Sequence, residues 1–300
     1  MRRTWKTLTI GLALGLGISA AHAAEEPFAD LDNNGVFSEG DVRIGKALAN
    51  DGQFSTDRAE ANYKPPLGPV SVVFPGKFVS KKRALIVKAS GNIIVNGDLS
   101  ASGSGGVIFL VSSGGSVRIG DGVRFTTDSI LQVVGMQDVT VGGRCNLRSK
   151  SGSFAMVSIA SQEGDVTVGD GCQLGAGGMV EVTTGDLTGG NVRIGKGSRL
   201  VAGSGSLRVT AGGDLQVTDS TLNGRDVLMG SHRSTRTSRS AGKAGPGYAS
   251  IRGSQIRSSG DGSVHLFASG GNGSTLDITK TSVKSKSRNG VRYDADVIVR

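Results

Sequence analysis

A nine-residue unit repeats without gaps in the central part of the chain. It reads apolar, polar, apolar, glycine, two turn residues, small or apolar, polar, apolar, and its four copies begin at Val117, Val139, Val166 and Val192. Such alternation places the apolar side chains on one face of a short strand. The glycine allows the chain to bend between two such strands. The unit therefore predicts many short strands joined by tight turns.

Looser copies extend the repeat in both directions. The first apolar residues of all eight copies are spaced by 22 to 34 residues, and they are Ile93, Val117, Val139, Val166, Val192, Leu215, Ala249 and Leu276. This spacing fits one coil of a β-solenoid per copy, and stacked coils bury a column of apolar side chains that one coil could not bury alone. We expect an all-β fold, a right-handed parallel β-helix of about eight coils over residues 93–300 with a small N-terminal cap. An antiparallel sandwich is the alternative.

The two cysteines support this register. Cys145 and Cys172 stand at the same position of neighbouring copies, 27 residues apart. In parallel strands their Cα atoms would lie about 4.8 Å apart, within the range of a disulfide. Parallel stacking also aims both side chains in the same direction, so two buried thiols are an equal alternative.

The start of the chain has the pattern of a secretory signal peptide. A basic start at Arg2, Arg3 and Lys6 precedes an apolar stretch from Leu8 to Ala20, and Ala21-His22-Ala23 fits a cleavage site. The apolar stretch is shorter than a membrane span of roughly 20 residues. Residues 1–23 are therefore predicted to be removed, and the mature chain is expected to be secreted, periplasmic or at the cell surface, without a transmembrane segment.

Residues 24–64 are expected to form the N-terminal cap, and residues 65–92, punctuated by prolines, to connect it to the β-helix. Within the cap, the stretch from Asp30 to Asp41 has oxygen-bearing side chains at positions 1, 3 and 5, glycine at 6 and a carboxylate at 12. It resembles a single calcium loop of the EF-hand and dockerin families. The resemblance implies a calcium ion bound by Asp30, Asp32, Asn34 and Asp41, with Val36 supplying a carbonyl.

The same stretch allows a second interpretation. Gly40-Asp41-Val42-Arg43-Ile44-Gly45 matches the repeat unit, so these residues could form a first coil. Asp30 to Asn34 would then be a turn without a metal ion.

Positive charge is concentrated near the C-terminus. From Arg225 to Arg300 the chain carries 13 basic and 5 acidic residues, and a loop at 230–247 contains Arg233, Arg236, Arg239 and Lys243. Such a patch can attract phosphate or sulfate groups, as in lipopolysaccharide, acidic polysaccharide or nucleic acid. No aromatic residues are interleaved with it, so specific nucleic-acid binding is not indicated. A solvated loop without a ligand is the alternative.

Residues suited to catalysis are sparse. His232 and His265 are the histidines beyond the signal peptide, and neither lies near a nucleophile motif. Pectate lyases use β-helices with clustered aspartates, but Asp138, Asp165 and Asp214 share their repeat position with Asn92, Ser116 and Asn191. This exchange is typical of a turn ladder. We expect a non-enzymatic protein.

Segments such as Leu207 to Val217 resemble the β-helical shafts of filamentous haemagglutinins and related bacterial surface proteins. The resemblance implies a structural or adhesive role at the cell surface, with a cell-surface polymer as partner. Binding of acidic polysaccharide through the basic C-terminal quarter is the second hypothesis. A polysaccharide-degrading enzyme of the same fold is the third.

Overall fold

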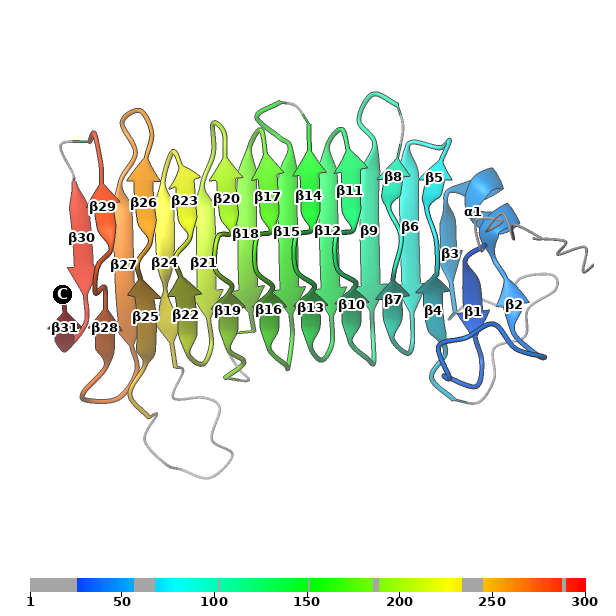
Figure 1. Ribbon diagram of the computed structural model, residues 1–300, viewed down its shortest axis with the longest axis horizontal. Coiled ribbons are helices and arrows are strands. Elements are labelled where there is room, and N and C mark those ends of the chain that lie inside the picture. The colour runs from blue at the N-terminus through cyan, green and yellow to red at the C-terminus, as the bar shows by residue number, and fades with distance from the viewer. Residues whose placement is uncertain are drawn as a thin grey trace, which may run out of the picture.

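The chain forms a β-solenoid of about eight turns, made almost entirely of strands (Figure 1). The structure is a computed structural model, and it describes residues 26–56, 68–101, 103–150, 152–185, 189–233, 245–287 and 290–300. Three long sheets run side by side along the molecule, and each coil contributes one strand to each sheet in turn. The all-β, parallel-coil fold predicted from the repeat is confirmed.

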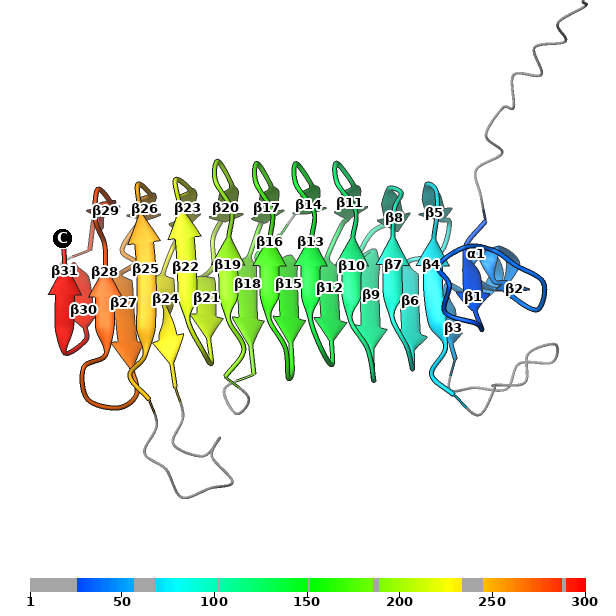
Figure 2. The same ribbon diagram turned by 60° about the horizontal axis from the view of Figure 1, so that its bottom comes forward.

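The largest sheet has twelve strands and contains the repeat unit. Figure 2 shows its strands side by side. In spatial order they are β2 (Val42–Arg43), β1 (Phe28–Asp30), β4 (Ser71–Phe74), β7 (Ile93–Val95), β10 (Val117–Ile119), β13 (Val139–Val141), β16 (Val166–Val168), β19 (Val192–Ile194), β22 (Leu215–Thr218), β25 (Tyr248–Arg252), β28 (Thr275–Asp277) and β31 (Val297–Val299).

The second sheet has ten strands, most of them longer. They are β3 (Gln53–Ser55), β6 (Ala84–Ala89), β9 (Val107–Ser112), β12 (Ile130–Gly135), β15 (Met156–Ser161), β18 (Met179–Thr184), β21 (Leu207–Ala211), β24 (Val227–His232), β27 (Val264–Ser269) and β30 (Val291–Asp294).

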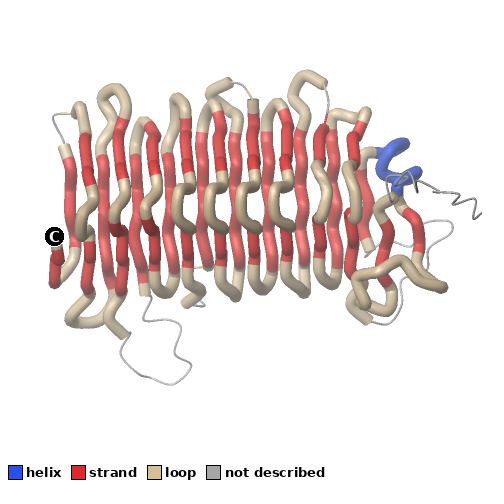
Figure 3. Tube along the Cα trace, in the orientation of Figure 1, coloured by secondary structure: helices blue, strands red, loops and turns tan. Residues whose placement is uncertain are grey.

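The third sheet has nine strands. They are β5 (Phe78–Ser80), β8 (Leu99–Ala101), β11 (Arg124–Thr127), β14 (Asn146–Ser149), β17 (Gln173–Ala176), β20 (Arg199–Ala202), β23 (Thr221–Gly224), β26 (Gln255–Ser258) and β29 (Ser282–Lys284). The turns that join the strands also stack along the molecule (Figure 3).

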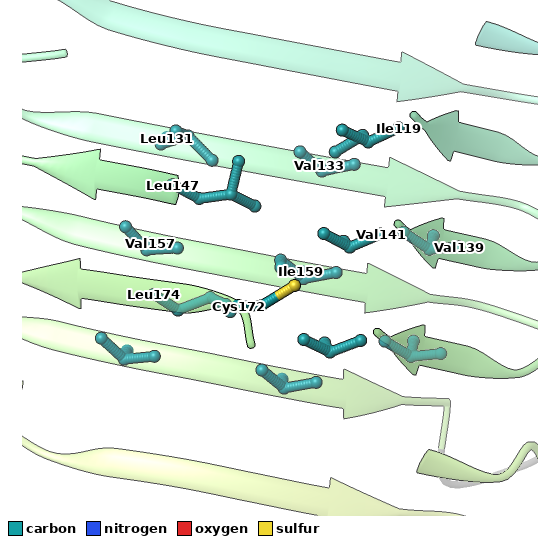
Figure 4. Packing of buried hydrophobic residues seen from close by; sticks show 14 of the residues in the cluster. Ile119, Leu131, Val133, Val139, Val141, Leu147, Val157, Ile159, Cys172 and Leu174 are labelled. Atoms are coloured by element: carbon teal, nitrogen blue, oxygen red, sulfur yellow. The ribbon is translucent and has the colours of Figure 1, made fainter. Parts of the chain in front are cut away.

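The register agrees with the alignment of the repeat. Val139 pairs with Val117 on one side and with Val166 on the other, and the pairing continues in step to Leu276. Equivalent apolar residues therefore lie over one another. Figure 4 shows Val139, Val141 and Leu147 within this packed interior. Full burial of each such side chain contributes roughly 1.5–3 kcal/mol.

Parallel stacking begins before residue 93, the boundary expected from the repeat. β4 pairs in parallel with β7, and β3 with β6. Residues 68–92 therefore contribute coils to the β-helix in addition to connecting it to the cap. The repeat does not reveal these coils because their sequences diverge from the unit.

The N-terminal end is covered by non-repeating elements. β1 pairs antiparallel with β4, and β2 pairs antiparallel with β1 at the outer edge of the sheet. Helix α1 (Gly45–Asp51) follows and buries Leu48. The interpretation of Gly40 to Gly45 as a first coil is wrong, because Val42 and Arg43 form this antiparallel strand.

Candidate functional site

The loop between β1 and β2 gathers acidic side chains at the N-terminal end. Asp30 is almost fully buried, with 1% of its surface exposed. Its two carboxylate oxygens accept hydrogen bonds from the backbone N–H groups of Asn34, at 3.2 Å, and Gly35, at 2.8 Å. Asp41 accepts a hydrogen bond from the N–H of Leu31 at 2.8 Å, which closes the loop onto its own start.

These contacts bring three carboxylates together. One oxygen each of Asp30, Asp32 and Asp41 lies within 4.8 Å of the other two, so the three groups could hold a metal ion. The side chain of Asn34 is engaged within the loop, since its Oδ1 accepts the N–H of Val36 at 2.7 Å. No arginine or lysine in the described ranges forms an ion pair with the three carboxylates.

Burial raises the pKa of the Asp30 carboxyl above its ordinary value. The neighbouring carboxylates of Asp32 and Asp41 add to the rise, and the N–H groups of Gly35 and Asn34 oppose it. A cation at this position would compensate the negative charge.

The outer surface of the ten-stranded sheet is apolar over several coils. Outward residues that pair with one another on successive strands form columns along the molecule. One such column carries only apolar residues, and a second carries apolar residues in three of five coils. Their neighbours along each strand point into the core. The first column is Ala84, Val107, Ile130, Met156 and Met179, and the second is Lys88, Val111, Val134, Ala160 and Thr183. The column between them holds Ile86 and Phe109, followed by the polar residues Gln132, Ser158 and Glu181. We call the apolar residues of these three columns the apolar face.

The outer surface of the nine-stranded sheet is basic and polar. From β11 to β29 its outward positions carry five basic residues and no acidic residue. The basic residues are Arg124, Arg148, Arg199, Arg257 and Lys284. We call this surface the basic face.

The basic C-terminal quarter is partly neutralised. Arg233 forms an ion pair with Asp214 at 2.9 Å, and Arg292 with Asp294 at 2.9 Å. Arg252 pairs with the buried carboxylate of Asp277. The other members of the predicted anion site, Arg236, Arg239 and Lys243, lie outside the described residues.

Cys145 and Cys172 are stacked as the repeat predicts, and both are buried free thiols. The Cys172 thiol donates to the carbonyl of Gly142 at 2.9 Å, and the Ser198 hydroxyl donates equivalently to Gly169 in the next coil. The neighbouring Cys145 side chain, together with burial, raises the pKa of the Cys172 thiol far above its ordinary value. The disulfide stays a prediction.

The recurring aspartates form the expected turn ladder. Asp138 accepts the N–H of Asp165 at 2.8 Å, and Asp165 accepts that of Asn191 at 2.7 Å. Asn191 in turn accepts the N–H of Asp214. Each carboxylate or amide thus satisfies the backbone of the next coil, which is a structural role.

The histidines make contacts that the sequence did not indicate. His232 Nδ1 lies 2.8 Å from the hydroxyl of Ser269, but no carboxylate among the described residues bonds its other nitrogen. His265 Nε2 lies 3.8 Å from Asp294, and burial, with Arg292, lowers the pKa of His265. A hollow of about 520 Å³ adjoins His265, Ser269 and Asp294. The serine–histidine–aspartate geometry is not assembled from these groups.

Comparison of the chain with protein-family models, curated proteins and solved structures yields no match. Among the described residues, no helix is long and apolar enough to cross a membrane.

Proposed function

We propose that this chain is an exported, non-enzymatic β-helix protein with a structural or adhesive role at the cell surface. The observation that carries the proposal is the apolar face of the ten-stranded sheet. Contiguous apolar surface on a soluble protein marks a site of association. Export is supported by the basic, apolar and small-residue regions of residues 1–23.

The apolar face is suited to attachment because its outward apolar side chains lie next to one another across neighbouring coils. Phe109 and Val111 lie on the same strand, and Val111 pairs with Val134 of the next coil. Their inward neighbours Ile108 and Leu110 are fully buried, so the outward side chains are not needed to fill the interior. A strand with both faces apolar is typical of a sheet covered on both sides.

Retention on cell-envelope fragments tests this proposal. The mature protein is expected to sediment with the fragments, and the Phe109→Lys/Val134→Lys variant is expected to stay in solution. Val79→Lys is the matched control, because Val79 is an exposed outward valine on the nine-stranded sheet. Equal retention of all three proteins contradicts attachment through the apolar face. Release of sugar products from envelope glycans contradicts the non-enzymatic assignment.

A second candidate function is binding of acidic polysaccharide. It is favoured by the basic surplus near the C-terminus and by the basic face. Retention on an immobilised acidic glycan is expected to fall as salt is added, because salt screens exposed charges. Loss of retention in the Arg233→Gln/Arg236→Gln/Arg239→Gln variant would place the binding in the C-terminal quarter.

We also propose that Asp30, Asp32 and Asp41 bind a calcium ion, as the loop's resemblance to the EF-hand and dockerin families implies. Calcium prefers six to eight oxygen ligands. The resemblance adds the Val36 carbonyl and Asn34 Oδ1, which in the structure accepts the N–H of Val36. Isothermal titration is expected to show uptake that is lost in Asp30→Ala/Asp32→Ala but kept in Asp51→Ala. Absence of uptake by the wild-type protein would leave the loop as a turn.

A further inference from the structure

The basic face is hollowed beside Gly175. Arg148 of β14, Gly175 of β17 and Val201 of β20 are paired neighbours in one outward column. Because Gly175 has no side chain, the column is interrupted there. A hollow of about 520 Å³ opens at this point, within the range of small-ligand sites.

Three cationic side chains line the hollow. Arg148 and Lys150 stand on the preceding coil, and Arg199 stands on the following coil. No carboxylate lines it. Arg148 Nη2 donates to Oε1 of Gln173, which also lines the hollow, at 2.8 Å.

The cations that line the hollow are not engaged in ion pairs, in contrast to some other arginines of the protein. Arg208, Arg233 and Arg252 each pair with a carboxylate. Within the described ranges, Arg148, Lys150 and Arg199 form no ion pair. Their charge is therefore available to an anionic ligand.

We propose that this hollow binds an acidic saccharide through the carboxylate or sulfate groups that its sugar units carry. The inference rests on the proposed polysaccharide binding and places it on the nine-stranded sheet rather than in the C-terminal quarter. Arginine forms bidentate, charge-assisted hydrogen bonds with such anions. Gln173 supplies an uncharged polar group that can bind sugar hydroxyls.

The hollow's surroundings favour a saccharide over a nucleic acid. No aromatic side chain lines it, so it offers no platform on which a base could stack. The outward column continues from Val201 through Asn223 to Arg257, so a polymer could extend from the hollow along the basic face.

Gly175 gives a steric test that leaves the charges intact. A Cβ at this position would meet Cγ of Arg148 at 3.9 Å and the Val201 carbonyl at 4.0 Å, which are ordinary contacts. The residue that pairs with Gly175 on the following coil, Val201, is itself a valine. Gly175→Val is therefore expected to fold while filling the floor of the hollow.

The experiment measures binding of a galacturonic acid hexamer and of a sulfated heparin hexasaccharide by titration calorimetry. These two probes distinguish carboxylate from sulfate recognition. Arg148→Gln/Arg199→Gln is expected to weaken binding of the preferred probe at least tenfold, and Gly175→Val to weaken it similarly. Arg124→Gln is the matched control, since Arg124 lies on the same face but outside the hollow, and a change below about threefold is expected. Thermal melting of each variant verifies that it folds.

Five outcomes would overturn the inference. An equal loss in Arg124→Gln would show that only net charge matters, and unchanged binding in Gly175→Val would show that the hollow is not used. Equal affinity for an oligothymidine of the same charge would refute the saccharide assignment. If the wild type binds either probe and only Arg233→Gln/Arg236→Gln/Arg239→Gln loses it, this site fails but polysaccharide binding stands. If no probe binds, both fail.

Discussion

At the scale of single residues, polar side chains in this protein mainly satisfy the backbone of a neighbouring coil. Asp138 and Asp165 each accept an N–H from the coil that follows. Asp30 differs, because it accepts N–H groups from within its own loop and lies beside two further carboxylates. Burial of its negative charge costs free energy because the carboxylate loses its hydration. Protonation or a bound cation removes that cost.

The pKa of Asp30 is therefore expected to lie above the ordinary aspartate value of about 3.9. The pKa of Asp30 is higher in the folded than in the unfolded protein. Ionisation of this group therefore makes the calcium-free protein less stable as pH rises from the unfolded pKa through the folded one. Carbon-13 NMR titration of the carboxyl group measures the pKa, and added calcium is expected to lower it. A calcium-free pKa below 3.9 would contradict this account.

The thiol of Cys172 is expected to be replaceable by a hydroxyl. Cys172→Ser should change the free energy of unfolding by less than about 1 kcal/mol, because the serine can donate to the Gly142 carbonyl as Ser198 does to Gly169. Leu174→Ala, two residues later in the core, should cost about 2–5 kcal/mol. Urea denaturation of reduced protein measures both, and a similar loss in each variant would refute the interpretation.

At the scale of the elements, the recurring glycine has a different role from the one its sequence position suggested. We expected Gly142 and Gly169 to provide freedom to bend. Instead, a Cβ on Gly169 would lie 2.8 Å from the backbone carbon of Gly142, the equivalent glycine of the preceding coil. The glycines therefore allow adjacent coils to approach at this corner.

Gly169→Ala is accordingly expected to destabilise the protein by about 1–3 kcal/mol through overpacking. Gly175→Ala is the matched control, because its Cβ would make only ordinary contacts, and it should be neutral or slightly stabilising. The midpoint of thermal unfolding reports the difference. Equal effects of the two substitutions would mean that coil spacing is not the constraint.

At the scale of the whole molecule, the two ends of the β-helix are unlike. The N-terminal end is covered by β1, β2 and α1, whereas the last coil exposes Val297, Ile298 and Val299 by 47%, 39% and 43%. Each coil of a solenoid is stabilised mainly by its neighbours. Among the described strands, β31 pairs with β28 alone, so it should open more easily than a strand that is paired on both sides.

Hydrogen exchange is expected to show this gradient. Amides of β30 and β31 should exchange fastest, and those of β12 and β15, which have paired strands on both sides, should exchange slowest. Mass spectrometry of peptic fragments resolves these segments. If β31 is as protected as β15 in dilute solution, another chain or segment must cover the end.

The core and the candidate sites differ in how far the sequence predicted them. Core residues such as Val139 and Val166 were predictable, because their repeat positions are the same and burial demands apolar groups. The acidic loop was also recognisable, since Asp30 to Asp41 are close in sequence. The grouping of Arg148 with Arg199 was not predictable. Their side chains point outward, where packing does not require apolar residues, so these positions follow no fixed pattern in the repeat.

The sequence by itself determines the parallel coils and their register, because identical units stacked in step place each apolar residue over its equivalent. Only the tertiary structure decides how the outer surfaces are composed. Arg148, Gly175 and Arg199 come from three successive coils, and they meet because strand pairing brings residues about 25 positions apart to adjacent places. The cap is likewise decided in three dimensions, since β1 and β2 pair antiparallel and follow no repeat.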